Sequence, residues 1–394
     1  MTTDQVIKLF EKYVIGNYTR LPKVIDRGQG SYIYDADGNK ILDMFPGWAV
    51  GGIGHCHPKV VKAIQQQAAK LLHMDNTFYT EPQGQLAKLL SQRAFGGKCF
   101  FCNSGAEANE AAMKLARIHT AKGKYKYITA FGGFHGRTFA TVTATAQPKK
   151  HAGFEPMLPG FIYVPFNDVD ALKNAFTDDV AAVMIEPIQG EGGINVATQE
   201  YMQAIRELCD KNQAVMILDE VQTGIGRTGK WFAYQHYDVE PDIITMAKAL
   251  GGGVAIGAMM AKANIAASLV PGTHASTFGG NCLACAAGIA VVEAIEEEKL
   301  LENAAKIGQY AADKLNQLKN KHNIIDHIRG KGLMIGIQLK SLGTEIVNKC
   351  LDAGLRINCT QETVLRFMPP MNVTAKQIDE AVNILDNVLG EMKK

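Results

Sequence analysis

The chain has 394 residues, 47% of them hydrophobic, and its 41 lysine and arginine residues nearly balance 39 acidic residues, for a net charge of +2. This length and composition provide for a sizeable core and favour two domains, while the near-neutral charge gives no reason to expect nucleic acid or a membrane surface as a partner. The N-terminus lacks a secretory apolar region and no apolar run approaches the ~20 residues of a membrane-spanning helix, so we expect a soluble cytoplasmic protein.

The eight cysteines include two CxxC pairs, Cys99/Cys102 and Cys282/Cys285. A zinc site made from both pairs is possible by residue type. The pairs are far apart in the chain, however, and each lies in an apolar or small-residue stretch. We therefore expect reduced thiols in the core and no metal.

The N-terminal part of the chain predicts short elements. Residues 1–20 indicate a helix, and alternating apolar residues around a turn indicate a hairpin over residues 31–44. A glycine-rich segment follows and becomes helical after Pro58. We assign residues 1–54 to an N-terminal segment that packs with a small domain.

A helix over residues 82–95 precedes the first candidate binding segment. There, a short apolar strand over residues 99–102 runs into a turn of small residues, from which a long helix begins. Free backbone N–H groups and the helix dipole at such a turn suit an anion, so Ser104, Gly105 and Ala106 are candidate phosphate ligands. The alternative is an ordinary serine N-cap on a surface helix.

The next strand, over residues 125–130, leads into the glycine-rich loop "FGGFHGRT". In that loop Phe134 is available to stack on a planar ring, and Arg137 offers a fork of donors for a carboxylate. A further apolar strand ends at Glu186, with Glu191 on the loop beyond it. Phe134 and Arg137 could each instead anchor the loop that carries them.

Two buried-type strands deliver ionisable side chains to turns. "AVMILDEVQTGIGRTG" carries Asp219 after its apolar run, and "PDIITMAKALGGG" carries Lys248. Ligands of parallel sheets bind at the carboxyl ends of the strands, where both side chains would lie. A desolvated lysine has a lowered pKa, and its neutral amine can form a Schiff base with a carbonyl. A lysine facing an aldehyde and a carboxylate facing a pyridine nitrogen are what pyridoxal phosphate requires.

Residues Gly224–Gly229 match the pattern GxGxxG. A dinucleotide fingerprint needs these glycines to open a helix directly after the strand, and here the stretch Asp219–Thr223 intervenes. A dinucleotide-binding oxidoreductase therefore remains a remote alternative, and it would give Lys248 no role.

The C-terminal part has a different pattern. Residues 286–320 indicate helix, residues 325–339 a hairpin, and the remainder short strands and a terminal helix. This α+β pattern contrasts with the α/β pattern before it. We therefore place a large domain over residues 55–285 and a small domain over residues 286–394.

The motifs "SGAEANEAAMKLAR", "FGGFHGRT", "EPIQGEGG", "LDEVQTGIGRTG", "MAKALGGG" and "STFGGN" occur in this order. Together they resemble the class III aminotransferases of the fold-type I pyridoxal-phosphate superfamily, and most of all the members that act on acetylornithine. The resemblance implies an α/β fold with a mostly parallel seven-stranded sheet flanked by helices, plus a smaller α+β domain built from the N- and C-terminal segments.

The resemblance also implies residue roles around pyridoxal 5'-phosphate. Lys248 would bind the cofactor and shuttle the reaction's proton, and Asp219 would pair with the pyridinium nitrogen. Other cofactor contacts would come from Ser104, Gly105 and Ala106 at the phosphate, Phe134 and Val221 on the two ring faces, Gln222 at the ring hydroxyl, and Thr277 at a phosphate across a dimer interface. A homodimer would be the functional unit.

For substrates, the resemblance implies that Arg137 clamps a carboxylate and that Ser276 contacts acetylornithine. Arg366 would bind the α-carboxylate of glutamate or 2-oxoglutarate, and Glu191 would pair with that arginine when the other substrate is bound. The implied activity transfers the δ-amino group of N2-acetylornithine to 2-oxoglutarate, in arginine biosynthesis. Alternatives are free ornithine, succinylornithine, succinyl-diaminopimelate or 4-aminobutyrate as the amine, and a non-catalytic scaffold.

One departure from the resemblance bears on substrate choice. Trp48 stands where many relatives have a smaller residue. We expect this side chain either to line the substrate mouth and change the acyl-group preference, or to pack in an interface.

Overall fold

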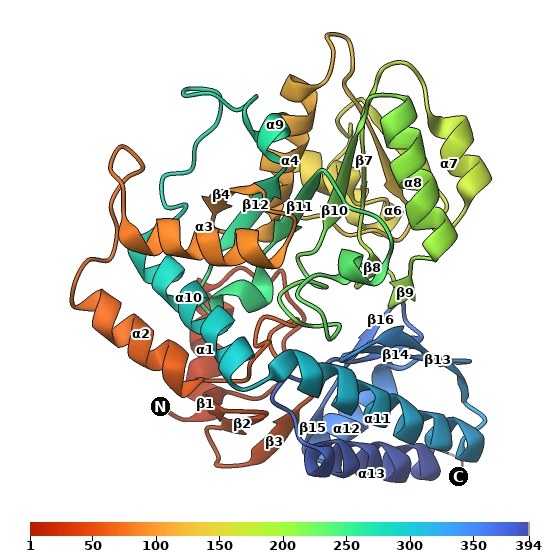
Figure 1. Ribbon diagram of the computed structural model, residues 1–394. Coiled ribbons are helices and arrows are strands. Elements are labelled where there is room, and N and C mark those ends of the chain that lie inside the picture. The colour runs from red at the N-terminus through yellow and green to blue at the C-terminus, as the bar shows by residue number, and fades with distance from the viewer. Residues whose placement is uncertain (393–394) are drawn as a thin grey trace.

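The computed structural model describes residues 1–392, and its centre is a seven-stranded sheet (Figure 1). In spatial order its strands are β4 (Lys98–Cys102), β12 (Gly257–Ala261), β11 (Ile243–Met246), β10 (Val215–Asp219), β7 (Val180–Ile185), β5 (Lys126–Ala130) and β6 (Phe161–Val164). Only β12 runs antiparallel to its neighbours in this sheet. The predicted mostly parallel seven-stranded sheet is confirmed.

The sheet is buried on both faces, as its continuous apolar runs predict. Within β10, Val215 and Ile217 belong to the cluster that contains α4, whereas Met216 and Leu218 belong to the main cluster on the opposite face. This alternation follows from the two-residue period of a strand. The result is a three-layer arrangement, with helices on each side of the sheet (Figure 1).

The helices between residues 58 and 297 pack around this sheet or extend from it. They are α2 (Pro58–Ala68), α3 (Glu81–Arg93), α4 (Gly105–His119), α5 (Phe139–Ala144), α6 (Pro148–His151), α7 (Val169–Ala175), α8 (Gln199–Lys211), α9 (Ala263–Ala266) and α10 (Cys282–Glu297), with the 3-10 turns η1 (Ala233–His236) and η2 (Lys248–Gly251). Pro58 is the first residue of α2, where its missing N–H has no helical partner to lose.

The N-terminal strands share a sheet with a strand from the far end of the chain. Its order is β1 (Ile25–Gln29), β2 (Tyr32–Asp35), β3 (Lys40–Asp43) and β15 (Leu355–Arg356). β2 and β3 form the expected hairpin, while β1 was not predicted. The helix α1 (Thr3–Tyr13) precedes them and has no buried residue.

The C-terminal residues build a second four-stranded sheet covered by helices. The strands, in spatial order, are β13 (Ile325–Lys331), β14 (Met334–Leu339), β17 (Val364–Phe367) and β16 (Asn358–Thr360), and the helices are α11 (Leu300–Lys321), α12 (Thr344–Asp352) and α13 (Ala375–Glu391). A small hairpin, β8 (Ile188–Gln189) and β9 (Asn195–Val196), lies beside this sheet (Figure 1).

The helical stretch predicted around residues 286–320 is interrupted at Lys299, which has a left-handed φ of 53°. The helix before this break, α10, begins at Cys282 and packs against α2 and α3. A boundary after residue 285 would therefore fall inside α10. The division into residues 55–285 and 286–394 stays a prediction.

The GxGxxG match at Gly224–Gly229 forms buried turns beneath α11. Arg227 is 1% exposed and donates to the carbonyl of Pro369, and its Nη2 has no partner among the described residues. Burial lowers the pKa of Arg227 to about 10. A Cβ added to Gly229 would lie 3.0 Å from Ala305 of α11. No helix of residues 1–392 begins at these glycines, although a dinucleotide fingerprint requires one.

None of the helices within residues 1–392 combines the length and apolarity needed to cross a bilayer. No group of three or more histidine, cysteine, aspartate or glutamate side chains in this range is arranged to hold a metal ion. All eight cysteines are free thiols.

Candidate active site

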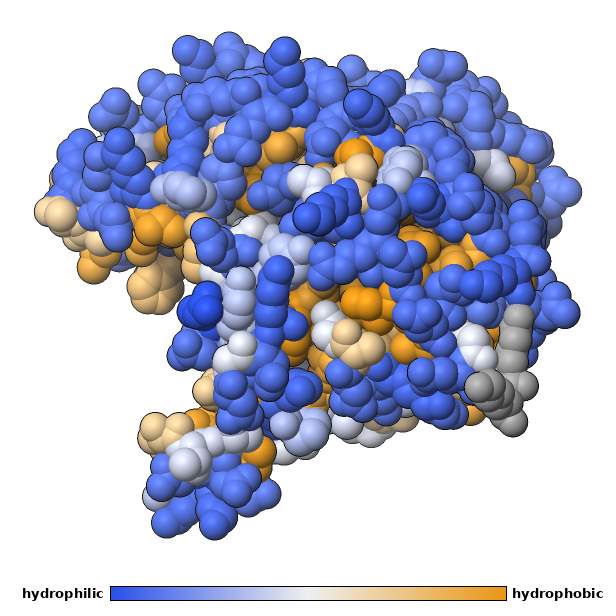
Figure 2. Space-filling view, turned by 90° about the horizontal axis from the view of Figure 1, so that it is seen from below, coloured by the Kyte–Doolittle hydropathy of each residue, from blue (hydrophilic) through white to orange (hydrophobic). Residues whose placement is uncertain are grey.

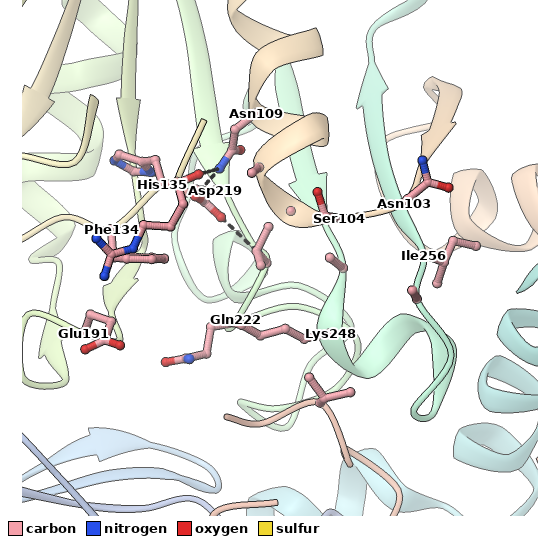
Figure 3. A pocket seen from close by; sticks show the side chains of 18 of the residues that line it. Asn103, Ser104, Asn109, Phe134, His135, Glu191, Asp219, Gln222, Lys248 and Ile256 are labelled. Atoms are coloured by element: carbon pink, nitrogen blue, oxygen red, sulfur yellow. Dashed lines mark hydrogen bonds and ion pairs between the residues drawn. The ribbon is translucent and has the colours of Figure 1, made fainter. Parts of the chain in front are cut away.

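A cavity of about 470 Å³ opens where β4, β5, β7, β10 and β11 end (Figure 3). Most of the residues singled out from the sequence line it. Its walls are formed by Val50, Asn103, Ser104, Gly105, Ala106, Asn109, Phe134, His135, Gly136, Arg137, Glu186, Glu191, Asp219, Val221, Gln222, Ala247, Lys248, Gly253, Val254, Ala255 and Ile256.

Lys248 follows β11 and enters the cavity from the turn η2. Its φ of 43° is left-handed, a conformation that L-residues adopt rarely and that is often found at functional sites. Burial lowers the pKa of Lys248, and the nearby charges of Asp219 and Glu186 oppose part of that effect. The lowered pKa raises the fraction of the neutral, nucleophilic amine at a given pH.

Asp219 ends β10 and is almost fully buried, with three donors on its carboxylate. Oδ2 accepts from Asn109 Nδ2 at 2.7 Å and contacts His135 Nδ1 at 2.8 Å, and Oδ1 accepts from the N–H of Val221 at 3.0 Å. These contacts fix the orientation of the carboxylate toward the cavity (Figure 3).

Asn109 and His135 were not among the predicted site residues. The Asn109 amide also donates to the carbonyl of His135 at 2.7 Å and accepts from the Thr245 hydroxyl at 2.6 Å. Burial alone would lower the pKa of His135, but its hydrogen bond to Asp219 and the charge of that carboxylate raise it overall. Asn109 could have been found as a polar residue on the otherwise apolar, alanine-rich face of a predicted helix.

Glu186 follows β7 and completes a cluster of ionisable groups. Its carboxylate accepts from the N–H groups of Phe134 and Gly190, each at 2.9 Å. Burial, assisted by the charge of Asp219, raises the pKa of Glu186 to about 7. The sequence placed this residue at a strand end but gave it no role.

The first turn of α4 lines the same cavity. Ser104 is its N-cap, and the Ser104 hydroxyl accepts from the N–H of Glu107 at 3.2 Å. The other first-turn amides lack partners within the helix, as at any helix N-terminus. Gly105 allows close approach of a neighbour, since a Cβ there would lie 2.8 Å from Val221. This end of the cavity is suited to a phosphate group.

Phe134, Val221 and Gln222 form the remaining predicted cofactor wall. The Gln222 side-chain oxygen is buried and has no partner among the described residues, and the same is true of His135 Nε2. An amine, a carboxylate, a side-chain amide and a helix N-terminus thus line one cavity. These donors and acceptors fit pyridoxal phosphate, which carries an aldehyde, a ring nitrogen, a hydroxyl and a phosphate.

The predicted substrate residues lie at different depths. Arg137 is exposed at the cavity wall, with its guanidinium carbon 5.6 Å from the centre of the Phe134 ring. Arg366 is 2% exposed and does not line the cavity. It lies behind Glu191, with 3.8 Å between Arg366 Nη2 and Glu191 Oε2. Burial lowers the pKa of Arg366, and the charge of Glu191 opposes this.

Ser276 and Thr277 are not brought to Lys248 within the chain. They line a separate cavity of about 460 Å³, of which Asn103 is also a wall. Asn103 Nδ2 donates to the Ser276 hydroxyl at 3.3 Å and so connects the two cavities. Trp48 does not line the main cavity either; its ring centre lies 6.3 Å from that of Tyr18.

The family description "Aminotransferase class-III" matches residues 13–389. The acetylornithine aminotransferase of Caldanaerobacter subterraneus subsp. tengcongensis is 53% identical over 97% of this chain and 98% of its own length. The acetylornithine aminotransferase of Methanocaldococcus jannaschii is 52% identical over the full length of both chains.

Among solved structures, the ornithine aminotransferase of Toxoplasma gondii ME49 has a TM-score of 0.95 at 33% identity, over 100% of this chain and 96% of that one. The acetylornithine aminotransferase of Elizabethkingia anophelis has a TM-score of 0.89 at 34% identity, over 99% and 100% of the two chains. A further structure of the T. gondii enzyme, with a TM-score of 0.94, carries PLP at partial occupancy in its active site.

These similarities extend over the whole cavity and all four sheets of the described residues. They confirm the predicted family, fold and cofactor class. From the match over residues 13–389 and the full-length identities above 50%, we conclude that the chain belongs to the class III aminotransferase family.

Proposed function

We propose that this protein transfers the δ-amino group of N2-acetyl-L-ornithine to 2-oxoglutarate, giving N-acetyl-L-glutamate 5-semialdehyde and L-glutamate in arginine biosynthesis. The convergence of Lys248, Asp219 and the N-terminus of α4 on one cavity supports an aminotransferase. The identity of about half of all residues with acetylornithine aminotransferases supports this amine substrate.

In this proposal pyridoxal phosphate supplies an aldehyde and an electron-withdrawing ring. Lys248 holds the cofactor through its amine and then moves a proton as a general acid and base. Asp219 orients the ring and keeps its nitrogen protonated, with Asn109 and His135 holding the carboxylate in place.

The rest of the cavity wall binds the cofactor without taking part in proton transfer. Ser104, Gly105 and Ala106 hold its phosphate at the α4 N-terminus. Phe134 and Val221 would cover the two ring faces, and the Gln222 amide would contact the ring hydroxyl, since all three residues line the cavity.

Two arginines distinguish the substrates. Arg137, at the exposed wall, binds the carboxylate of acetylornithine, and Arg366, deeper in the protein, binds a carboxylate of 2-oxoglutarate or glutamate. A buried guanidinium requires a negative partner. Glu191 fills that need at 3.8 Å when the bound substrate has a single free carboxylate, and it moves away when a dicarboxylate is bound.

We also propose a homodimer with shared sites. Thr277 lies outside the chain's own cofactor cavity, in a second cavity beside the exposed ring of Phe278. Phe78 and Tyr79 are exposed as well. On the face shown in Figure 2, apolar side chains reach the surface beside a recess in the outline. A second copy would cover such surfaces and bring Thr277 to the phosphate and Ser276 to the substrate.

We place the enzyme in the cytoplasm. The eight free thiols are consistent with a reducing compartment.

A visible absorption spectrum of the purified protein, taken with pyridoxal phosphate, tests the function. The cofactor band should bleach rapidly with N2-acetylornithine and slowly with ornithine, and 2-oxoglutarate should restore it. The second candidate is ornithine aminotransferase, favoured by the TM-score of 0.95 with the T. gondii enzyme. Faster bleaching by ornithine would select this candidate, and Lys248→Ala should abolish bleaching by either amine.

The molar mass of the protein, measured by light scattering as it elutes from a size-exclusion column, tests the dimer. A fully active monomer would contradict the proposal.

A further inference from the structure

One short strand of the C-terminal sheet contacts both members of the Arg366–Glu191 pair. In β16, Asn358 and Thr360 are two residues apart and therefore project from the same face of the strand. Asn358 Oδ1 accepts from Arg366 Nε at 2.7 Å, in register with the β16–β17 pairing of these two residues. Thr360 contacts Glu191 from the same face.

The Thr360 hydroxyl reaches two oxygens of Glu191. Its Oγ1 lies 2.7 Å from the backbone carbonyl oxygen and 3.2 Å from carboxylate Oε2. A hydroxyl has one proton, so it donates to one of these oxygens at a time. The carbonyl has a second donor, because Gln361 Nε2 lies 3.0 Å from it. The hydroxyl can therefore serve the carboxylate without leaving the carbonyl unpaired.

This hydroxyl is the nearest described donor to Glu191 Oε2. Arg366 Nη2 is 3.8 Å away, beyond hydrogen-bond range, whereas the 3.2 Å contact to Thr360 is within it. Thr360 itself is 7% exposed, so water competes little for its proton. The position of Glu191 beside Arg366 thus depends on the threonine at least as directly as on the arginine.

The same hydroxyl also makes the outward position of Glu191 accessible. When the carboxylate turns away, the hydroxyl proton returns to the carbonyl at 2.7 Å, and no buried polar atom of Thr360 is left unpaired. Glu191 is followed by two glycines, and its side chain is 29% exposed, so it has room to turn toward the cavity.

We propose that Thr360 is a positioning residue that sets the fraction of time for which Glu191 pairs with Arg366. Thr360 thereby sets the relative affinity for dicarboxylate and acylated-diamine substrates. This inference rests on the proposed function. Removing the hydroxyl destabilises the conformation in which Glu191 pairs with Arg366. Arg366 is then free more often, and a dicarboxylate binds more tightly while the acylated diamine binds less well.

The test measures binding of glutarate, an unreactive dicarboxylate, to the cofactor-loaded enzyme by calorimetry. Thr360→Val should bind glutarate roughly three- to tenfold more tightly than wild type, the factor set by one hydrogen bond of ordinary strength. Thr360→Ser retains the hydroxyl and should match wild type. Thr120→Val removes a hydroxyl that donates to the carbonyl of Ala116 at the C-terminal end of α4, outside the cavity lining, and should also match wild type.

A gain in affinity separates this role from simple structural damage, which would weaken binding. Glu191→Gln should shift glutarate affinity in the same direction, and Thr360→Ala provides the measurement if the valine variant does not fold. In steady state, Thr360→Val should lower KM for 2-oxoglutarate and raise KM for N2-acetylornithine.

Unchanged or weaker glutarate binding in Thr360→Val, with both half-reactions intact in wild type, would overturn the inference. Wild type that does not accept acetylornithine would instead overturn the proposed function.

Discussion

Asn109 donates to Asp219 through a hydrogen bond of 2.7 Å, and both side chains are almost fully buried. Hydrogen bonds to a buried charged group are worth about 1.5–3 kcal/mol. Asn109→Ala should therefore weaken pyridoxal phosphate binding and lower kcat by about tenfold or more, as measured by cofactor titration and steady-state kinetics.

Asn212→Ala provides the control for that experiment. Asn212 caps α8 and donates to the carbonyl of Leu208, outside the cavity. Equal effects of the two substitutions on cofactor affinity would contradict a specific role for Asn109.

Glu186→Gln should change the pH dependence of cofactor uptake. The charged Glu186 raises the pKa of Lys248, so removing the charge lowers that pKa and increases the neutral amine at a given pH. The protein stripped of cofactor should then take up pyridoxal phosphate faster than wild type above pH about 7. Below that pH the two proteins should converge, because the pKa of Glu186 itself is about 7 and the wild-type carboxyl is then neutral. Stopped-flow absorbance measures these rates from pH 6 to about 10, roughly three units above neutrality. A rate difference confined to low pH would contradict the effect of the Glu186 charge on Lys248.

Phe45→Leu should weaken dicarboxylate binding, opposite in sign to Thr360→Val. The Arg366 guanidinium carbon lies 4.5 Å from the centre of the fully buried Phe45 ring. Loss of this cation–π contact, worth about 0.5–2 kcal/mol, should reduce glutarate affinity by a few-fold or more in calorimetry. Phe232→Leu replaces another fully buried ring, away from Arg366, and should reduce stability without changing glutarate affinity. If Phe45→Leu and Phe232→Leu bound glutarate with equal affinity, the Phe45 ring would have no role in dicarboxylate binding.

Gly257→Ala should damage the phosphate end of the cavity. A Cβ at Gly257 would lie 2.3 Å from the carbonyl oxygen of Ser104, so the first turn of α4 would have to shift. We expect cofactor binding to be weaker by about five- to thirtyfold, since one or two phosphate contacts of about 1 kcal/mol each would be lost. Gly84→Ala, in the exposed part of α3 with no atom within 4 Å of the new Cβ, should leave cofactor binding unchanged and increase stability by about 0.5–1 kcal/mol. Cofactor titration and thermal unfolding of both variants measure these effects.

The sequence was most informative where local patterns decide the structure. Apolar runs before Asp219 and Lys248 predicted that both residues lie at carboxyl ends of strands in a parallel sheet, and the structure adds that β10 and β11 are parallel neighbours. A small-residue turn before a helix predicted the α4 N-terminus at Ser104. These features depend on strand period and helix capping, which are local properties.

Contacts between segments far apart in the chain were harder to predict from the sequence. Asn109 and Asp219 are 110 residues apart, and the pairing of Thr360 with Glu191 spans 169 residues. No periodicity in the chain links such positions, because they meet only through the topology of the sheets. The separation of Thr277 from the cavity likewise depends on the path of the loop before α10.

The contacts of Arg227 affect how the protein unfolds. Its carbonyl accepts from the N–H of Leu333 at 3.1 Å, and its guanidinium donates to the carbonyl of Pro369, so two C-terminal segments hold one loop that begins only five residues after Asp219. If those segments separated, a guanidinium with an already unsatisfied Nη2 would lose its remaining described partner. The C-terminal segments therefore support the loop that follows Asp219, and denaturant should release the cofactor at the concentration at which these segments unfold.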